Sequence, residues 1–208
     1  MSNQKLVGLS LAIFPILAFA GWIILGAILG FDNGPHEPQS YIAALGANSD
    51  AVKIIFPIIT LFFIIVIGGL GFISNLMEGG SGHFMARFGF LLMVIAAPGF
   101  VTEGGLQMGA AEAASLGSLQ TAQTLFAAGG AIGALATALM FIGFLVIGLG
   151  ILKQKNFHVI IAAVMVIAGI FTTAICVIDY SNQLIVIGYV GFCLATSALG
   201  ISLLRSAE

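Results

Sequence analysis

Glu103 is the residue of this chain whose type and position best suit chemistry. It lies near the end of the apolar stretch 88–109, in a chain where charged residues make up only 7% of the total. A carboxylate inside the hydrocarbon of a membrane is a functional candidate by default, because an unpaired charge is costly there. Gln107 follows one helical turn later on the same face. With Gln123 and Asp179 expected at a similar height, these residues predict a polar vestibule on the outer side.

The depth of Glu103 follows from its separation from Arg87, which is expected at the inner edge of the membrane. About 16 residues at about 1.5 Å each place Glu103 roughly 24 Å up a hydrocarbon core about 30 Å thick. Pro98 removes a backbone donor just before it and can kink the helix. Two interpretations stay open: a site that handles a proton or solute, or an interfacial carboxylate solvated where the helix emerges.

A metal site is a weaker candidate, in the connection that follows the first apolar stretch. Asp32, His36 and Glu37 offer oxygen and nitrogen ligands. Their spacing matches no standard metal motif, and a proline-rich loop is reason enough for polar residues. We therefore expect no metal at these residues.

Cofactors and catalytic residues are not expected either. No histidine or lysine lies in the middle of an apolar stretch, which disfavours a His-ligated haem and a retinal Schiff base. The paired acids or the nucleophile and base of membrane enzymes are not evident. The sequence therefore leans against an enzyme.

Long apolar helices must position Glu103. Hydrophobic residues make up 60% of the 208 residues and charged residues only 7%, whereas about 25% of the residues of a soluble domain are charged. Roughly 20 apolar residues are needed to cross a bilayer as a helix, and membrane strands would alternate in polarity, which these stretches do not. Six such stretches occur, at about 6–31, 54–76, 88–109, 121–152, 157–178 and 184–204. The sequence predicts an all-α polytopic membrane protein, a single domain of six transmembrane helices over residues 1–208.

The first stretch has features of a secretory signal peptide. Lys5 precedes an apolar segment that contains Ala18-Phe19-Ala20, a small-residue pattern typical of a cleavage site. The hydrophobicity continues without a break through Trp22 to Leu29. We therefore expect a retained transmembrane helix rather than a cleaved signal.

The distribution of charge predicts the orientation. Cytoplasmic connections retain Lys and Arg, and with six spans five of the six basic residues fall on one side, with Lys53 alone on the other. The five are Lys5, Arg87, Lys153, Lys155 and Arg205. Six of the eight acids fall on the side of Lys53, namely Asp32, Glu37, Asp50, Glu103, Glu112 and Asp179. Both termini are therefore expected in the cytoplasm.

The connections on the Lys53 side are the longest. Tyr41 to Gly46 is predicted as a short surface helix, and the Ala, Ser and Gly of 109–120 predict an extension of the neighbouring helices.

Small residues predict how the helices associate, because close backbone approach drives packing in lipid. Gly129, Gly133 and Thr137 recur every four residues. They form either a packing face within the chain, which six helices favour, or the interface of a homodimer. The partners that we expect are the lipid bilayer and, through this stripe, other membrane subunits or a second copy; no nucleic acid is expected.

Parts of the chain resemble small six-helix membrane protein families of prokaryotes whose function is unknown. The resemblance lies in Gly21-Trp22, in Tyr41 to Gly46 and in the stretch from Phe141 through Lys153 to Gly169. It implies a six-helix bundle, in a prokaryotic plasma membrane, and assigns no functional residue.

Two functions from different classes remain. The sequence favours a non-enzymatic membrane component, such as an accessory subunit or sensor, because its loops are short, its small residues form stripes and no charged residue is expected to be buried. The alternative is a small solute or proton-coupled transporter with an outward-facing vestibule around Glu103. The transporter requires Glu103 to face the interior of the bundle.

Overall fold

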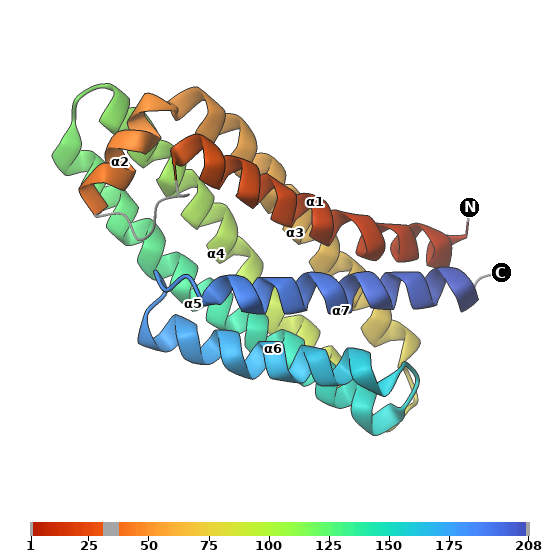
Figure 1. Cartoon of the computed structure of the whole chain (residues 1–208). Coiled ribbons are helices and arrows are strands. Elements are labelled where there is room, and N and C mark those ends of the chain that lie inside the picture. Colours follow the sequence, from red (N-terminus) through yellow and green to blue (C-terminus); the bar gives the residue numbers. More distant parts are fainter. Residues whose placement is uncertain (1, 31–37, 207–208) are drawn as a thin grey trace.

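The computed structural model describes residues 2–30 and 38–206, and within these ranges the chain is all-α (Figure 1). Seven helices occur in the described residues: α1 (Asn3–Leu29), α2 (Pro38–Ala47), α3 (Ser49–Leu76), α4 (His83–Ser115), α5 (Leu119–Gln154), α6 (Val159–Ile178) and α7 (Ile185–Ser206). Six of them, all except α2, are long and apolar enough to cross a membrane. The predicted helical class and the six candidate spans are confirmed.

The connections predicted to be helical are also confirmed, and they lengthen the bundle at one end. The segment 109–120 extends both neighbours, so that α4 has 33 residues and α5 has 36. Gly117 turns the chain between them with a φ of 78°, a left-handed conformation that glycine adopts without strain. The predicted surface helix at Tyr41–Gly46 is part of α2.

The six long helices form a closed ring in chain order. Each packs against the next, from α1 through α3, α4, α5 and α6 to α7, and α7 returns to α1. Both chain termini lie together at one end of the ring, and α2 lies at the opposite end (Figure 1). We call these the terminal end and the α2 end.

Glycines bring the helix backbones of the ring together. A Cβ on Gly89 of α4 would lie 2.5 Å from the carbonyl oxygen of Gly143 in α5, and one on Gly200 of α7 would lie 2.5 Å from that of Gly8 in α1. Real Cβ atoms do not come this close, so these positions require glycine. Packing in lipid depends on such close contacts, and the second pair is at the junction that closes the ring.

Aromatic side chains fill the middle of the ring. Phe141 and Phe144 of α5 and Phe192 of α7 are fully buried. The ring centroids of Phe144 and Phe192 are 4.8 Å apart, and those of Phe141 and Tyr189 are 5.3 Å apart in an edge-on arrangement. Phe63 of α3 contacts Phe192 at 6.0 Å. The interior is therefore closed by packed rings about half-way along the bundle.

The short helix α2 covers the α2 end and packs mainly on α4. Ile42 and Leu45 are buried beneath it, and Tyr41 lies 5.0 Å from Phe126 of α5 between ring centroids. A Cβ on Gly46 would lie 2.8 Å from the Cβ of Ala114, so α2 rests closely on the end of α4. The space between α2 and the aromatic packing contains the candidate site.

Candidate functional site

Glu103 faces the interior of the ring. Its side chain is only 9% exposed, and its carboxylate rests on the backbone of α5 at Gly133, where any Cβ would overlap it. Helix α4 continues about 12 residues, or about 18 Å, beyond Glu103, whereas the α6–α7 connection lies at its level and supplies its hydrogen-bond partner, Tyr180. Of the two interpretations that the sequence leaves open, burial favours a site over a solvated carboxylate.

A chain of three hydroxyl groups from three segments leads to this carboxylate. The hydroxyl of Tyr180 lies 3.1 Å from Oε1 of Glu103 and 3.3 Å from Oγ1 of Thr137 in α5. Thr137 Oγ1 also lies 3.3 Å from the hydroxyl of Tyr189 in α7. The chain of hydrogen bonds thus runs from α7 through α5 and the α6–α7 connection to α4.

The direction of these hydrogen bonds follows from counting protons. Each hydroxyl has one proton, and an ionised carboxylate only accepts. Tyr180 therefore donates to Glu103, Thr137 donates to Tyr180, and Tyr189 donates to Thr137. When Glu103 is ionised, all three O–H dipoles point toward its charge.

The protonation of Tyr180 supports this direction. Burial raises the pKa of the Tyr180 hydroxyl well above its ordinary value, and the negative charge of Glu103 acts in the same direction. The phenol therefore keeps its proton at physiological pH and remains a donor to Glu103.

A cavity of about 30 Å³ adjoins Glu103. Six aromatic residues stand among the described residues that line it, and Glu103 is the charged one; Thr60 adds a hydroxyl. The aromatic residues are Trp22, Phe56, Phe63, Phe100, Tyr180 and Tyr189. A site of about 10 to 15 Å³ holds one water molecule, so this space suits an occupant of one or two heavy atoms.

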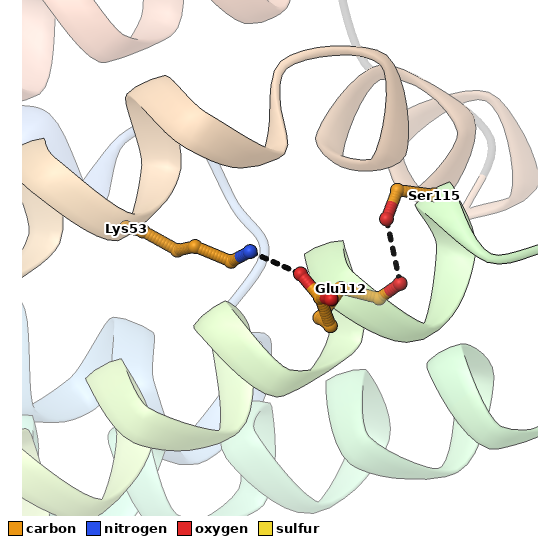
Figure 2. A network of polar contacts seen from close by, with 3 residues as sticks. All are labelled: Lys53, Glu112 and Ser115. Atoms are coloured by element: carbon orange, nitrogen blue, oxygen red, sulfur yellow. Dashed lines mark hydrogen bonds and ion pairs between the residues drawn. The ribbon is translucent and has the colours of Figure 1, made fainter.

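No cation neutralises Glu103 within residues 2–30 and 38–206. The ion pair found in this part of the chain joins Lys53 of α3 to Glu112, at the α2 end (Figure 2). Glu112 also accepts a bond on its backbone carbonyl from the Ser115 hydroxyl, at 2.8 Å (Figure 2). The basic residue nearest to the α2 end is thus already engaged by another acid.

The other residues predicted for the vestibule divide into two groups. Gln107 is 6% exposed and packs toward Gly129 of α5, and its Oε1 has no hydrogen-bond partner among the described residues. Gln123 and Asp179 are exposed. Asp179 ends α6, and its Oδ1 accepts a hydrogen bond from the backbone N–H of Ser181 at 3.0 Å. The structure therefore brings Gln107 to the same α4–α5 interface as Glu103 and leaves Gln123 and Asp179 at the surface.

The stripe Gly129, Gly133 and Thr137 is buried within the chain. Gly129 lies against Leu106 and Gln107, Gly133 against Glu103, and Thr137 bonds to the two tyrosines. This is the packing face within the chain that the sequence favours, and it also forms one wall of the site.

The sequence alone did not indicate that Thr137, Tyr180 and Tyr189 are connected to Glu103 by hydrogen bonds. Thr137 stood out only as a small residue, and Tyr180 as an anchor at the membrane surface. Tyr189 offered a signal, because a hydroxyl in the middle of an apolar helix needs a partner when buried.

The residues that the sequence offered as weak candidates for a metal site are not part of the described structure. Asp32, His36 and Glu37 lie outside the described residues. Within the described ranges no group of three His, Cys, Asp or Glu side chains comes together. The described site therefore combines one carboxylate, hydroxyls and aromatic walls, a set suited to binding positive charge.

Comparisons with protein-family models, with curated proteins and with solved structures give no match.

Proposed function

We propose that this chain is a small multi-pass membrane transporter in which Glu103 binds the positive charge that is carried, in the simplest case a proton. The observation that supports this proposal is the burial of Glu103 inside the ring, beside a cavity and without a cationic partner among the described residues. An isolated buried charge is expensive, so this carboxylate has much to gain from binding a proton or another cation. A site that exchanges charge in this way is what a proton-coupled carrier requires.

The distribution of proline supports movement around the site. Helices α1, α3 and α4 each contain one internal proline, Pro15, Pro57 and Pro98, and all three helices line the cavity. Each proline removes a backbone hydrogen bond and lets the helix bend. Helices α5, α6 and α7 contain no proline. We propose that the first three helices bend against the second three to expose Glu103 to either side.

A second candidate function is that of an accessory subunit or sensor. It is favoured by the aromatic packing between the site and the terminal end. Phe141, Phe144 and Phe192 close the ring interior toward the terminal end. In that case the charge on Glu103 would change the shape of the α2 end without any solute crossing.

A measurement of proton transport distinguishes the two candidate functions. Purified protein is reconstituted in vesicles that contain a pH-sensitive dye, and proton influx is driven by a potassium diffusion potential. We expect the parent protein to conduct protons and Glu103→Gln to lose at least tenfold in rate. Glu78→Gln, an exposed acid at the terminal end, is the matched control and should behave as the parent. A Glu103→Gln variant that folds and conducts normally would favour the accessory or sensor function.

The orientation is a separate part of the proposal: we place both termini in the cytoplasm and the protein in a prokaryotic plasma membrane. Its support is the basic bias toward the terminal end, where Lys5, Arg87 and Lys153 lie. In a background with both native cysteines replaced, an impermeant thiol reagent added to intact cells should label Ser118→Cys in the α4–α5 turn. It should spare Asn156→Cys in the α5–α6 turn. The opposite labelling would reverse the orientation.

A further inference from the structure

We infer that the cavity beside Glu103 binds a small ammonium-type cation, ammonium itself or methylammonium. This inference rests on the proposed function and names its substrate class. It is carried by three independent properties of the cavity: the chemistry of its walls, the number of its charges and its size.

The walls of the cavity are mainly aromatic. Trp22 and Phe56 meet edge to face with ring centroids 5.3 Å apart, and Phe63 and Phe100 stack at 6.0 Å. Aromatic faces attract cations, most strongly where water is excluded, and grouped rings are a known means of recognising ammonium groups. A neutral solute can donate a hydrogen bond to the carboxylate but lacks the charge attraction that a cation gains from it.

The polar side-chain atoms of the cavity are too few for a magnesium or calcium ion. Magnesium and calcium need six or more oxygen ligands in defined shells, whereas the described lining offers the Glu103 carboxylate and the hydroxyls of Thr60, Tyr180 and Tyr189. Tyr180 and Tyr189 already donate their protons along the chain to Glu103, so their oxygens and the second carboxylate oxygen can act toward a cation only as acceptors. An ammonium group has several N–H donors for them, and its single charge matches one carboxylate.

The size of the cavity selects among ammonium cations. Its volume of about 30 Å³ is roughly that of two water sites by the same measure. Ammonium has one heavy atom and methylammonium two, and both fit. Tetramethylammonium has five heavy atoms and requires the packed rings to separate. We therefore expect the site to reject it.

Equilibrium binding of radiolabelled methylammonium to the purified full chain in detergent tests the inference. We expect saturable binding of one ion per chain, with ammonium competing and with sodium and tetramethylammonium failing to compete at the same concentration. Glu103→Gln should weaken binding at least tenfold. Phe56→Leu keeps the apolar volume and loses the aromatic face, and should weaken it about three- to tenfold. Phe84→Leu, at an 80% exposed ring near the terminal end, is the control and should bind as the parent.

The outcomes separate this inference from the proposed function. If methylammonium fails to bind while Glu103-dependent proton influx persists, the ligand inference is wrong and the transporter proposal stands. If methylammonium binds but no ion or proton crosses vesicle membranes, the ligand inference stands and the transporter proposal fails. Competition by sodium at equal concentration, or binding that is the same in Glu103→Gln, would overturn the ammonium site. Melting curves of each variant in detergent establish that it is folded, and Glu103→Asp, which keeps the charge, should retain part of the affinity.

Discussion

Glu103 and Glu112 are two carboxylates on one helix with opposite environments. Nine residues separate them along α4, which at about 100° per residue places them on opposite faces. Glu112 lies with its side chain 47% exposed, paired with Lys53 of α3. Glu103 is buried against α5, where hydroxyl groups and aromatic rings take the place of a cation. The same chemical group thus forms a surface ion pair at one position and, at the other, an interior site without a cationic partner among the described residues.

The two environments differ in how much the partner of the carboxylate contributes to the free energy of unfolding. A surface ion pair is worth about 0 to 1 kcal/mol, because water already solvates both charges. A hydrogen bond to a buried charge contributes about 1.5 to 3 kcal/mol, because the charge has few other partners. The partners of Glu103 should therefore matter more to stability than the partner of Glu112, and a ligand has more to gain at Glu103.

The largest effect is expected from filling the space that Glu103 occupies. Gly133→Leu should destabilise the bundle by about 3 kcal/mol or more, because the new side chain and the Glu103 carboxylate overlap and α4 must move from α5. Gly130→Leu is the matched control, since a Cβ at Gly130 meets no atom within 4 Å. Thermal melting in detergent compares the two. Equal melting temperatures would show that Glu103 does not need its place on α5.

The next effect concerns the donor to Glu103. Tyr180→Phe removes the hydroxyl and keeps the ring, so the unfolding free energy should fall by about 2 kcal/mol. The loss should shrink when Glu103→Gln is already present, because the charge that the hydroxyl serves is gone. A double-mutant cycle measures this coupling. Additive losses would mean that Tyr180 acts only through packing.

A smaller effect is expected in the middle of the hydroxyl chain. Thr137→Val keeps the shape and leaves the Tyr189 hydroxyl without its acceptor, which should cost about 1 kcal/mol. Thr173→Val is the control, since the buried Thr173 hydroxyl has no hydrogen-bond partner among the described residues. That variant should match the parent or exceed it in detergent melting. A Thr137→Val variant as stable as Thr173→Val would remove Thr137 from the site.

The smallest effect is expected on the Glu112 side. Lys53→Met should change the unfolding free energy by about 0.5 kcal/mol or less, and the difference should vanish in high salt. Denaturant unfolding at low and high ionic strength measures it. A loss above about 2 kcal/mol would contradict the contrast between the two carboxylates.

The sequence by itself determined the six candidate membrane spans and singled out Glu103 as the candidate functional residue. Long apolar stretches can satisfy their backbone in a bilayer only as helices, so the six candidate spans followed from composition and length, and the small-residue spacing indicated a packing face at Gly129, Gly133 and Thr137. Glu103 was identified because a carboxylate in such a stretch is costly in a bilayer, although the sequence left open that it is solvated where the helix emerges. Even the helical extensions at 109–120 followed from the Ala-rich composition.

Only the tertiary structure decided which side chains meet at Glu103. The six candidate transmembrane helices are apolar on most sides, so periodicity does not tell which face turns inward. The sequence grouped Gln123 and Asp179 with Glu103 only by their expected height along the membrane. The ring closed by α1 and α7 instead turns Tyr189 inward and carries Tyr180 over the carboxylate, while Gln123 and Asp179 stay exposed. The rotation of each helix about its axis is set by contacts with neighbours that are distant in sequence, such as Gly8 with Gly200, and those contacts exist only once the ring is assembled.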